Sequence, residues 1–382
     1  MTNELREYEQ RLNELLAAIQ PADREAMRKA RERQDYLAKV PGSLGRLEEI
    51  SVRIAGITGK VTGNSAKNQG IIVCCADNGV VAEGVASAPQ SVTQMQTINF
   101  TRRITGMGSQ AAYFGIDVLD IDVGVKLPIP PELYTERMID ENGRIARLIV
   151  NRRILNGTRN LAQEPAMTRE EALRAFVVGI EAAEAMKKAG KDIIGVGEMG
   201  IGNSTTGANL ICAYTGADPV TAIGRGGGLS NDGLAKKARV VQDAVARYKS
   251  EDPVETARGM GGLDICAMAG AYLGAASLRM PAVVDGYISI AAALLAQALC
   301  PTVTDYLFTS HLSQEPGYQA AAKKLGIKPF FSLDMKLGEA SGCPIAFQII
   351  EAGLAVMNGM KTLAEASIDA DYLDEFREEG LF

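Results

Sequence analysis

Tryptophan is absent from this chain, histidine occurs once (His311), and no two cysteines form a Cys-x-x-Cys pair. The six cysteines lie mostly in apolar runs such as Ile71–Ala76. One histidine and scattered thiols do not make a set of metal ligands, so the sequence predicts no metal site. We expect reduced, buried thiols in a cytoplasmic protein.

A positive net charge and a membrane-spanning run are also lacking. The 382 residues contain 40 Lys and Arg against 46 Asp and Glu, a formal net charge of −6, so no positive field would attract a nucleic acid. The longest apolar stretch, Ile288–Cys300, is interrupted by Gln297 and is shorter than the roughly 20 residues that cross a bilayer. The charged, amphipathic segment 1–20 does not resemble a signal peptide. We therefore expect neither a nucleic acid nor a membrane as partner.

Short apolar runs, often β-branched, alternate with Ala- and Gly-rich helical stretches from about residue 70. The expected strands are 70–76, 117–121, 192–196, 220–223, 282–284, 306–309 and 330–333. Continuously apolar strands that alternate with helices are typical of a mostly parallel sheet covered on both faces. The sequence thus predicts an α/β, Rossmann-like fold in which helices flank the sheet.

Both ends of the chain have helical patterns. Residues 3–38 are rich in Glu, Arg, Leu and Ala and contain no glycine, and Pro344–Met360 is apolar and precedes the acidic stretch Asp369–Phe382. We expect these helices to pack together as a smaller helical domain, residues 1–59 with 339–382, beside a large α/β domain over residues 60–338.

Most of the expected strands end in polar or glycine-rich tips, and ligands of open parallel sheets bind beyond these carboxyl ends. The tips are Asp77–Gly79, Asp122–Gly124, Glu198–Gly200, Gly224–Gly226, Asp285–Tyr287 and Ser310–His311. So many polar tips on one edge predict a polar crevice there, with His311 expected as a strand-end residue near it.

The segment Gly195–Gly200 matches the dinucleotide fingerprint G-x-G-x-x-G. Glu198 counts against a dinucleotide, because it places a carboxylate where a pyrophosphate would lie. The acidic residue expected about twenty positions further on is absent as well. Arg225 could instead bind a 2′-phosphate, so an NADP-dependent oxidoreductase stays an alternative.

The same loop suits a monophosphate better, because backbone amides and hydroxyls at a helix start favour an anion. These groups belong to Gly200, Gly202, Asn203, Ser204 and Thr205. A second glycine-rich loop, Gly224–Asn231, precedes Lys236 and Lys237, and a lysine there could neutralise a phosphate. A capped helix with tight packing and two solvated lysines is the purely structural alternative.

Glu339 follows an apolar run and precedes a helix with Pro344 in its first turn. The positive end of that helix would help keep the carboxylate ionised and competent as a general base. A glutamate beside a helix start is more often only a complement to the helix dipole, so its position alone leaves both interpretations open.

Taken together, these segments resemble the nicotinate-nucleotide–dimethylbenzimidazole phosphoribosyltransferase family over roughly residues 35–365. The motifs that carry the resemblance are Pro41–Glu48, Ala76–Val80, Glu83–Val85, Pro89–Thr93, Asp122–Gly124, Gly195–Asn203, Gly261–Asp264, Asp285–Gly286, Ser310–His311 and Leu337–Glu339. Each motif is weak alone, and their number and order make the resemblance specific.

The resemblance implies that a benzimidazole nitrogen attacks C1′ of nicotinate mononucleotide and that nicotinate leaves, giving the α-ribotide used as the lower ligand of cobamides. It implies Glu339 as the general base, and neither a cofactor nor a metal. The residues that it assigns to acceptor binding are Ala88, Gln96, Met199 and Leu337. Those for nucleotide and phosphate binding are Glu198, Gly200, Gly202, Asn203, Lys237, Asp285 and Ser310.

The chain departs from the family pattern at Asn78, where histidine is usual, at Ala88, where serine or tyrosine is usual, and at Ala340, where glycine is usual. Because Ala88 lacks a hydroxyl near the acceptor, we hypothesise an altered acceptor range that includes phenols, purines or substituted benzimidazoles. The family implies a homodimer, and relatives that use phenols imply a heterodimer with a paralogue. A non-catalytic subunit of such a heteromer is the alternative function, against which the retained Glu339 counts.

Overall fold

The protein is described here by a computed structural model that covers residues 3–224, 228–369 and 371–373. Within these residues eight strands form one sheet in the order β3-β4-β2-β1-β5-β6-β7-β8, and every neighbouring pair is parallel. The strands are β1 (Gln69–Ala76), β2 (Asp117–Gly124), β3 (Tyr134–Thr135), β4 (Ile149–Asn151), β5 (Ile193–Met199), β6 (Ala282–Val284), β7 (Leu307–His311) and β8 (Pro329–Phe331). The expected α/β fold with a parallel sheet is confirmed.

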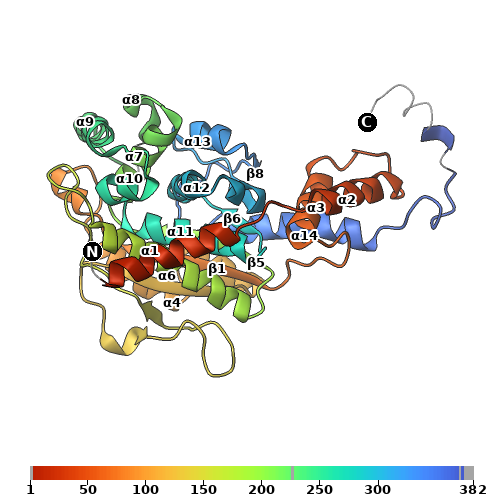
Figure 1. The fold of residues 1–382 in the computed structure, drawn as a ribbon, viewed down its shortest axis with the longest axis horizontal. Helices are drawn as coiled ribbons and strands as arrows, with labels where there is room; N and C mark the ends of the chain where they lie inside the picture. The colour runs from red at the N-terminus through yellow and green to blue at the C-terminus, as the bar shows by residue number, and fades with distance from the viewer. Residues whose placement is uncertain (1–2, 225–227, 370, 374–382) are drawn as a thin grey trace.

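Helices cover both faces of the sheet (Figure 1). On one face α6, α11 and α12 contact the central strands, with α11 between the other two, and on the other face α4, α5 and α14 contact the sheet. The α-helices are α1 (Asn3–Ala18), α2 (Arg24–Tyr36), α3 (Arg46–Thr58), α4 (Ser91–Thr101), α5 (Gly106–Phe114), α6 (Arg169–Lys188), α7 (Asn203–Thr215), α8 (Pro219–Ala222), α9 (Asn231–Tyr248), α10 (Pro253–Met260), α11 (Leu263–Ser277), α12 (Tyr287–Leu299), α13 (Tyr318–Leu325) and α14 (Cys343–Gly359). Short 3₁₀ helices are η1 (Gly79–Glu83), η2 (Pro131–Leu133), η3 (Pro301–Tyr306) and η4 (Asp371–Leu373).

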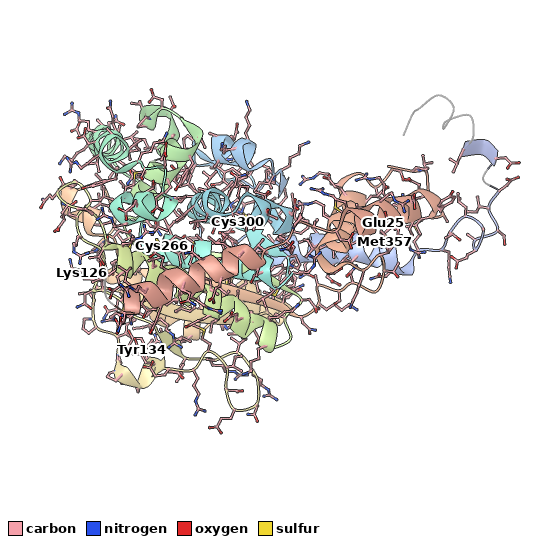
Figure 2. All side chains as sticks on the ribbon, in the orientation of Figure 1. Glu25, Lys126, Tyr134, Cys266, Cys300 and Met357 are labelled. Atoms are coloured by element: carbon pink, nitrogen blue, oxygen red, sulfur yellow. The ribbon has the colours of Figure 1, made fainter. Side chains whose placement is uncertain are left out.

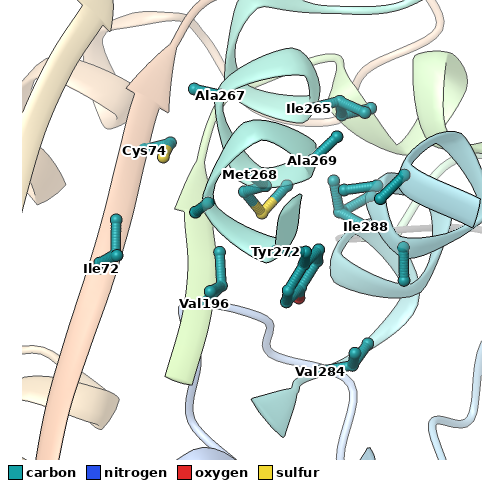
Figure 3. Packing of buried hydrophobic residues seen from close by; sticks show 14 of the residues in the cluster. Ile72, Cys74, Val196, Ile265, Ala267, Met268, Ala269, Tyr272, Val284 and Ile288 are labelled. Carbon is teal, nitrogen blue, oxygen red and sulfur yellow. The ribbon is translucent and has the colours of Figure 1, made fainter. Parts of the chain in front are cut away.

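The core is densest where α11 lies on the sheet. Met268 and Tyr272 of α11 pack beside Val196 of β5 (Figure 3). A glycine allows α11 and α6 to approach closely, since a Cβ on Gly179 would lie 1.8 Å from the carbonyl oxygen of Ala267. This packing fixes β1 and β5, whose carboxyl ends carry polar residues.

One expected strand is wrong: residues 220–223 do not form a strand but lie in and after the short helix α8. The reason is local, because the Asp218 carboxylate accepts a hydrogen bond from the Val220 amide (2.6 Å) and Pro219 occupies the first helical position. Val220 is 70% exposed, so its β-branched side chain does not enter the core. The other expected strands are confirmed, with boundaries shifted by a few residues.

Part of the terminal segments forms a lobe of α2, α3 and the C-terminal half of α14, with its own small core of Ala30, Val52, Ala55 and Met357 (Figure 2). In contrast to the expectation, α1 does not pack in this lobe but along α6 and α11 on the large α/β body (Figure 1). The domain boundaries at 60 and 338 stay a prediction. Most of the acidic segment 369–382 lies outside the described residues.

The cysteines are all unpaired. Among the helices of the described residues, none is long and apolar enough to cross a membrane. The same residues contain no group of three or more His, Cys, Asp or Glu side chains placed to hold a metal ion.

Candidate active site

A cavity of about 780 Å³ lies at the carboxyl ends of β5, β6 and β7, on the edge where the strand tips predicted a polar crevice. Two smaller cavities, of about 280 and 300 Å³, lie elsewhere. The walls of the large cavity are residues 85–88, 92, 96, 198–204, 228, 285–289, 311, 313, 315 and 336–339.

All predicted site residues line this cavity except Lys237 and Ser310, which lie directly behind it. The Lys237 ammonium donates hydrogen bonds to the Ser204 hydroxyl (3.0 Å) and to the Gly224 carbonyl (3.2 Å). The Ser310 hydroxyl donates to the backbone carbonyl of Asp285 (3.2 Å). Ser204 and Asp285 both line the cavity, so Lys237 and Ser310 support its wall from behind. A direct contact of Lys237 or Ser310 with a ligand stays a prediction.

Glu339 combines burial with one fixed and one unpaired carboxylate oxygen. It is 5% exposed, and Gln96 on α4 donates a hydrogen bond to its Oε1 (3.0 Å) while Asn99 orients the Gln96 amide (3.0 Å). Its Oε2 forms no hydrogen bond with any described residue. Burial raises the pKa of Glu339, although Gln96 and the nearby Met107 amide favour the charged form. A buried carboxylate with a raised pKa and a free oxygen is suited to general-base catalysis.

The turn that carries Glu339 is pressed against the sheet. Glu339 and Ala340 both have left-handed backbone conformations, with φ of 60° and 61°, which are strained for residues other than glycine. A Cβ on Gly197 of β5 would lie 2.3 Å from the Ala340 nitrogen. The Gly342 amide donates to Oδ1 of Asp285 (2.7 Å). The carboxylate is therefore positioned by contacts with β5 and β6.

These contacts explain the glycines of the segment 195–200. Gly195 and Gly197 lie inside β5, whereas the dinucleotide fingerprint needs its glycines in the turn after the strand. A Cβ on Gly195 would lie 2.6 Å from the Cβ of Cys343, so both glycines permit close packing of the Glu339 turn and α14. The dinucleotide interpretation is wrong in this context, and Arg225, on which its NADP form depended, lies outside the described residues.

Three further buried carboxyl groups surround the strand ends. Burial raises the pKa of Glu198 to about 8, and repulsion from Asp264 adds to the effect. Burial likewise raises the pKa of Asp264 and of Asp285 to about 7. The Asn203 amide donates to both Glu198 and Asp264 and joins them. Asp264 was not predicted as a site residue, although it ends the motif Gly261–Asp264, and the structure places it in the first turn of α11.

The start of α7 supplies positive character to the same cavity. Gly202 is its N-cap with φ of 97°, a conformation that favours glycine, and residues 200–204 line the cavity. Lys237 is 1% exposed, and burial lowers its pKa to about 8. At pH 7 the lysine is still mostly protonated, so the helix start and its ammonium group together favour an anion.

The raised pKa values make the stability of the free protein depend on pH. Glu198, Asp264 and Asp285 contribute to the free energy of unfolding through their raised pKa values. This contribution is fully present below the unfolded pKa values near 4, and it is lost as pH rises through about 7 and 8. His311 and Lys237, whose pKa values burial lowers to about 4 and about 8, act in the opposite direction, but His311 does so only below its unfolded value of 6.5 and Lys237 mainly from about pH 8 upward. We therefore expect the calorimetric Tm to fall by several degrees between pH 6.5 and 8.

A matched pair of variants tests whether the buried carboxyl groups cause the fall in Tm. Glu198→Gln keeps the shape of the side chain and removes one titrating group, so the fall in Tm should become shallower. Glu141→Gln changes a glutamate whose side chain is 84% exposed and should leave the slope as it is. A Tm that stays constant or rises over this pH range would contradict the assignment.

Comparison with known proteins finds relatives of this chain over almost its whole length. A phosphoribosyltransferase family model matches residues 19–368. The nicotinate-nucleotide–dimethylbenzimidazole phosphoribosyltransferase of Clostridium perfringens is 45% identical over 373 residues, 97% of this chain and 99% of that protein. The enzyme of the same name from Clostridium tetani is 42% identical over 371 residues, 96% of this chain and 98% of that protein. The crystal structure of such an enzyme from Thermus thermophilus superposes with a TM-score of 0.82 at 36% identity, covering 91% of this chain and 99% of that one.

Proposed function

Because this chain belongs to the nicotinate-nucleotide–dimethylbenzimidazole phosphoribosyltransferase family, we propose that it transfers phosphoribose from nicotinate mononucleotide to a benzimidazole-type base. The products are an α-ribotide for the lower ligand of cobamides and nicotinate. The observation that supports the proposal most directly is Glu339, a buried carboxylate with one oxygen fixed by Gln96 and one unpaired among the described residues, in the wall of the 780 Å³ cavity.

The reaction follows from the charges of its reactants. A benzimidazole nitrogen forms a bond to C1′ as the glycosidic bond to nicotinate breaks, and the electron pair of that bond returns to the pyridinium nitrogen. The leaving group thus departs as a neutral ring, and no pyrophosphate has to be neutralised, so the chemistry calls for no divalent metal. The acceptor must lose the proton on its second nitrogen, and we assign that proton to Glu339.

We assign the phosphate to the start of α7, because a helix start favours an anion, and to the ammonium group of Lys237, which donates a hydrogen bond to Ser204 in the first turn of that helix. Gly200, Gly202 and Asn203 belong to that helix start, and Ser310 lies behind the wall at Asp285. A protonated Glu198 or Asp285 would repel the nucleotide less than two carboxylates, and the raised pKa values leave Glu198 mostly and Asp285 about half protonated at pH 7.

The acceptor base is assigned to the wall formed by Ala88, Gln96, Met199 and Leu337. Ala88 has no hydroxyl, so this wall selects its ligand mainly by shape and apolar contact. For this reason we propose that the site takes phenols, purines and substituted benzimidazoles as acceptors. For a phenol the nucleophile is oxygen, and its proton also passes to Glu339.

We further propose a dimer, either of two identical chains or of this chain with a paralogue. Sedimentation of the purified protein, alone and with the paralogue, distinguishes the two. In the alternative function the chain is a non-catalytic subunit, and the position of Glu339 in the cavity wall argues against that role.

The direct test is to mix the purified protein with nicotinate mononucleotide and an acceptor, without metal, and to follow nicotinate and α-ribotide together. We expect equal amounts of the two products with dimethylbenzimidazole, and ratios of kcat/KM across benzimidazoles, phenols and purines define the acceptor range. If no acceptor yields an α-ribotide, the isolated chain is not the proposed catalyst.

A further inference from the structure

His311 is the only histidine of the chain, and the function proposed above gives it no role. It ends β7, its side chain is completely buried, and it belongs to the wall of the 780 Å³ cavity. Its ring packs beside Phe331, with the ring centroids 6.1 Å apart. A buried imidazole at a cavity wall has one nitrogen that donates a hydrogen bond and one that accepts, and the surroundings decide which is which.

The contacts around Nδ1 favour one tautomer of His311. The Ser310 hydroxyl has a single proton, which it donates to the carbonyl oxygen of Asp285 (3.2 Å). Ser310 Oγ also lies 3.0 Å from Nδ1 of His311, so in this contact it accepts and Nδ1 carries the proton. Oδ1 of Asp285, a second acceptor, lies 3.7 Å from the same Nδ1. Both neighbours therefore favour a proton on Nδ1 and a lone pair on Nε2.

Nε2 has no hydrogen-bond partner among the described residues. It lies next to Gly286, where a Cβ would be 3.6 Å from Nε2 and from Cε1, and Gly286 also lines the cavity. Glycine brings no side chain to that edge of the ring, which is buried in the free protein. Because burial lowers the pKa of His311 to about 4, Nε2 stays an acceptor at neutral pH. A buried acceptor without a donor is unfavourable, which favours a ligand that brings one.

We propose that His311 accepts, through Nε2, a hydrogen bond from a ribose hydroxyl of the phosphoribosyl donor. The proposal rests on the proposed function, which names that donor. At pH 8 nicotinate mononucleotide carries a dianionic phosphate and a carboxylate, which only accept hydrogen bonds, so its 2′- and 3′-hydroxyls are the groups that donate. The one N–H of a benzimidazole acceptor is already assigned to Glu339. His311 is thereby a ribose-binding residue that selects for a sugar hydroxyl.

The single histidine makes a direct measurement simple. In protein labelled with ¹⁵N-histidine, one imidazole gives all ring signals, and we expect a protonated Nδ1 and an unprotonated Nε2 in the free state. Saturation with nicotinate mononucleotide at pH 8, without acceptor base, should shift the Nε2 signal in the direction of a hydrogen-bonded nitrogen. The 2′-deoxy or the 3′-deoxy analogue should fail to produce this shift, which identifies the hydroxyl. A protonated Nε2 in the free state, or an unchanged Nε2 signal at saturation, overturns the proposal.

Two substitutions test the consequence for turnover. In His311→Asn the amide NH₂ replaces the Nδ1 donor and no acceptor replaces Nε2, whereas in His311→Gln the amide reaches the position of Nε2. We expect wild-type protein to prefer the ribotide over the relevant deoxy analogue by roughly 10-fold or more in kcat/KM. His311→Asn should reduce that preference to about twofold or less, and His311→Gln should retain part of it.

The outcomes separate this proposal from the proposed function. Wild-type protein that forms α-ribotide but shows no preference against either deoxy analogue overturns the role of His311 and leaves the function intact. Wild-type protein that forms no α-ribotide, yet shows the Nε2 shift with nicotinate mononucleotide, overturns the function and retains the ribose contact. Without turnover and without the shift, both are overturned.

Discussion

Glu339→Gln is expected to lower kcat/KM for α-ribotide formation by about 10²–10⁴-fold, the usual contribution of a general base. Glutamine has the shape of glutamate, so its Oε1 can still accept the hydrogen bond from Gln96 that the wild-type carboxylate accepts. What it loses is the basic oxygen. The Tm of the variant should therefore stay close to the wild-type value, while steady-state nicotinate release falls.

The pH profile and a rescue experiment give this prediction its specificity. Burial raises the pKa of Glu339, so wild-type kcat should increase with pH through a value above that of an ordinary glutamate, and the variant should lack this step. Glu339→Ala leaves space that a small carboxylate can enter, so formate should restore part of its activity but none to Glu339→Gln. If turnover of Glu339→Gln equals that of the wild type, Glu339 is not the base.

The sheet and the edge that carries the site could be predicted because both depend on local sequence. β1 is buried along its whole length and is an unbroken apolar run after Gln69. The polar tips of β5, β6 and β7 gather at one end because all three strands are parallel. Strands β3 and β4, of two and three residues, are too short to give a pattern. The predicted strand over residues 220–223 is wrong because the Asp218-Pro219 helix start outweighs the β-branched residues that follow it.

The parts of the site that could not be predicted depend on contacts between distant segments. Lys237 stands beside Lys236 on α9, in a pattern typical of a solvated helix face, and is buried only because Ser204 and the Gly224 carbonyl accept its hydrogen bonds. The position of Glu339 depends on Gln96, 243 residues away in the sequence. Neither pairing has a signature in composition or periodicity.

The contact between Gly197 and Ala340 also joins two segments that are distant in the sequence. From this contact we predict a large effect of the substitution Gly197→Ala on kcat. In Gly197→Ala the new methyl group would lie 2.3 Å from the Ala340 nitrogen and 2.7 Å from its Cβ. The nearest atom belongs to the backbone, so the turn that carries Glu339 has to move. A displacement of about 1 Å at a reacting group can lower the rate by roughly 10², and we expect a loss of that size in kcat.

A structural defect alone would produce a different result. Overpacking of this kind costs about 1–3 kcal/mol of stability, so most of the Gly197→Ala protein should remain folded. Because the phosphate is assigned to α7, the variant should bind nicotinate mononucleotide with an affinity within about threefold of the wild type. Gly207→Ala is the matched control. Its methyl group would lie 3.2 Å from Cδ1, the end of the Ile288 side chain and not a backbone atom, and alanine favours the helix. If Gly197→Ala keeps wild-type kcat while its Tm falls, the turn tolerates displacement and the contact serves only packing. If kcat falls while nucleotide affinity is retained, close packing against β5 is what holds the base in position.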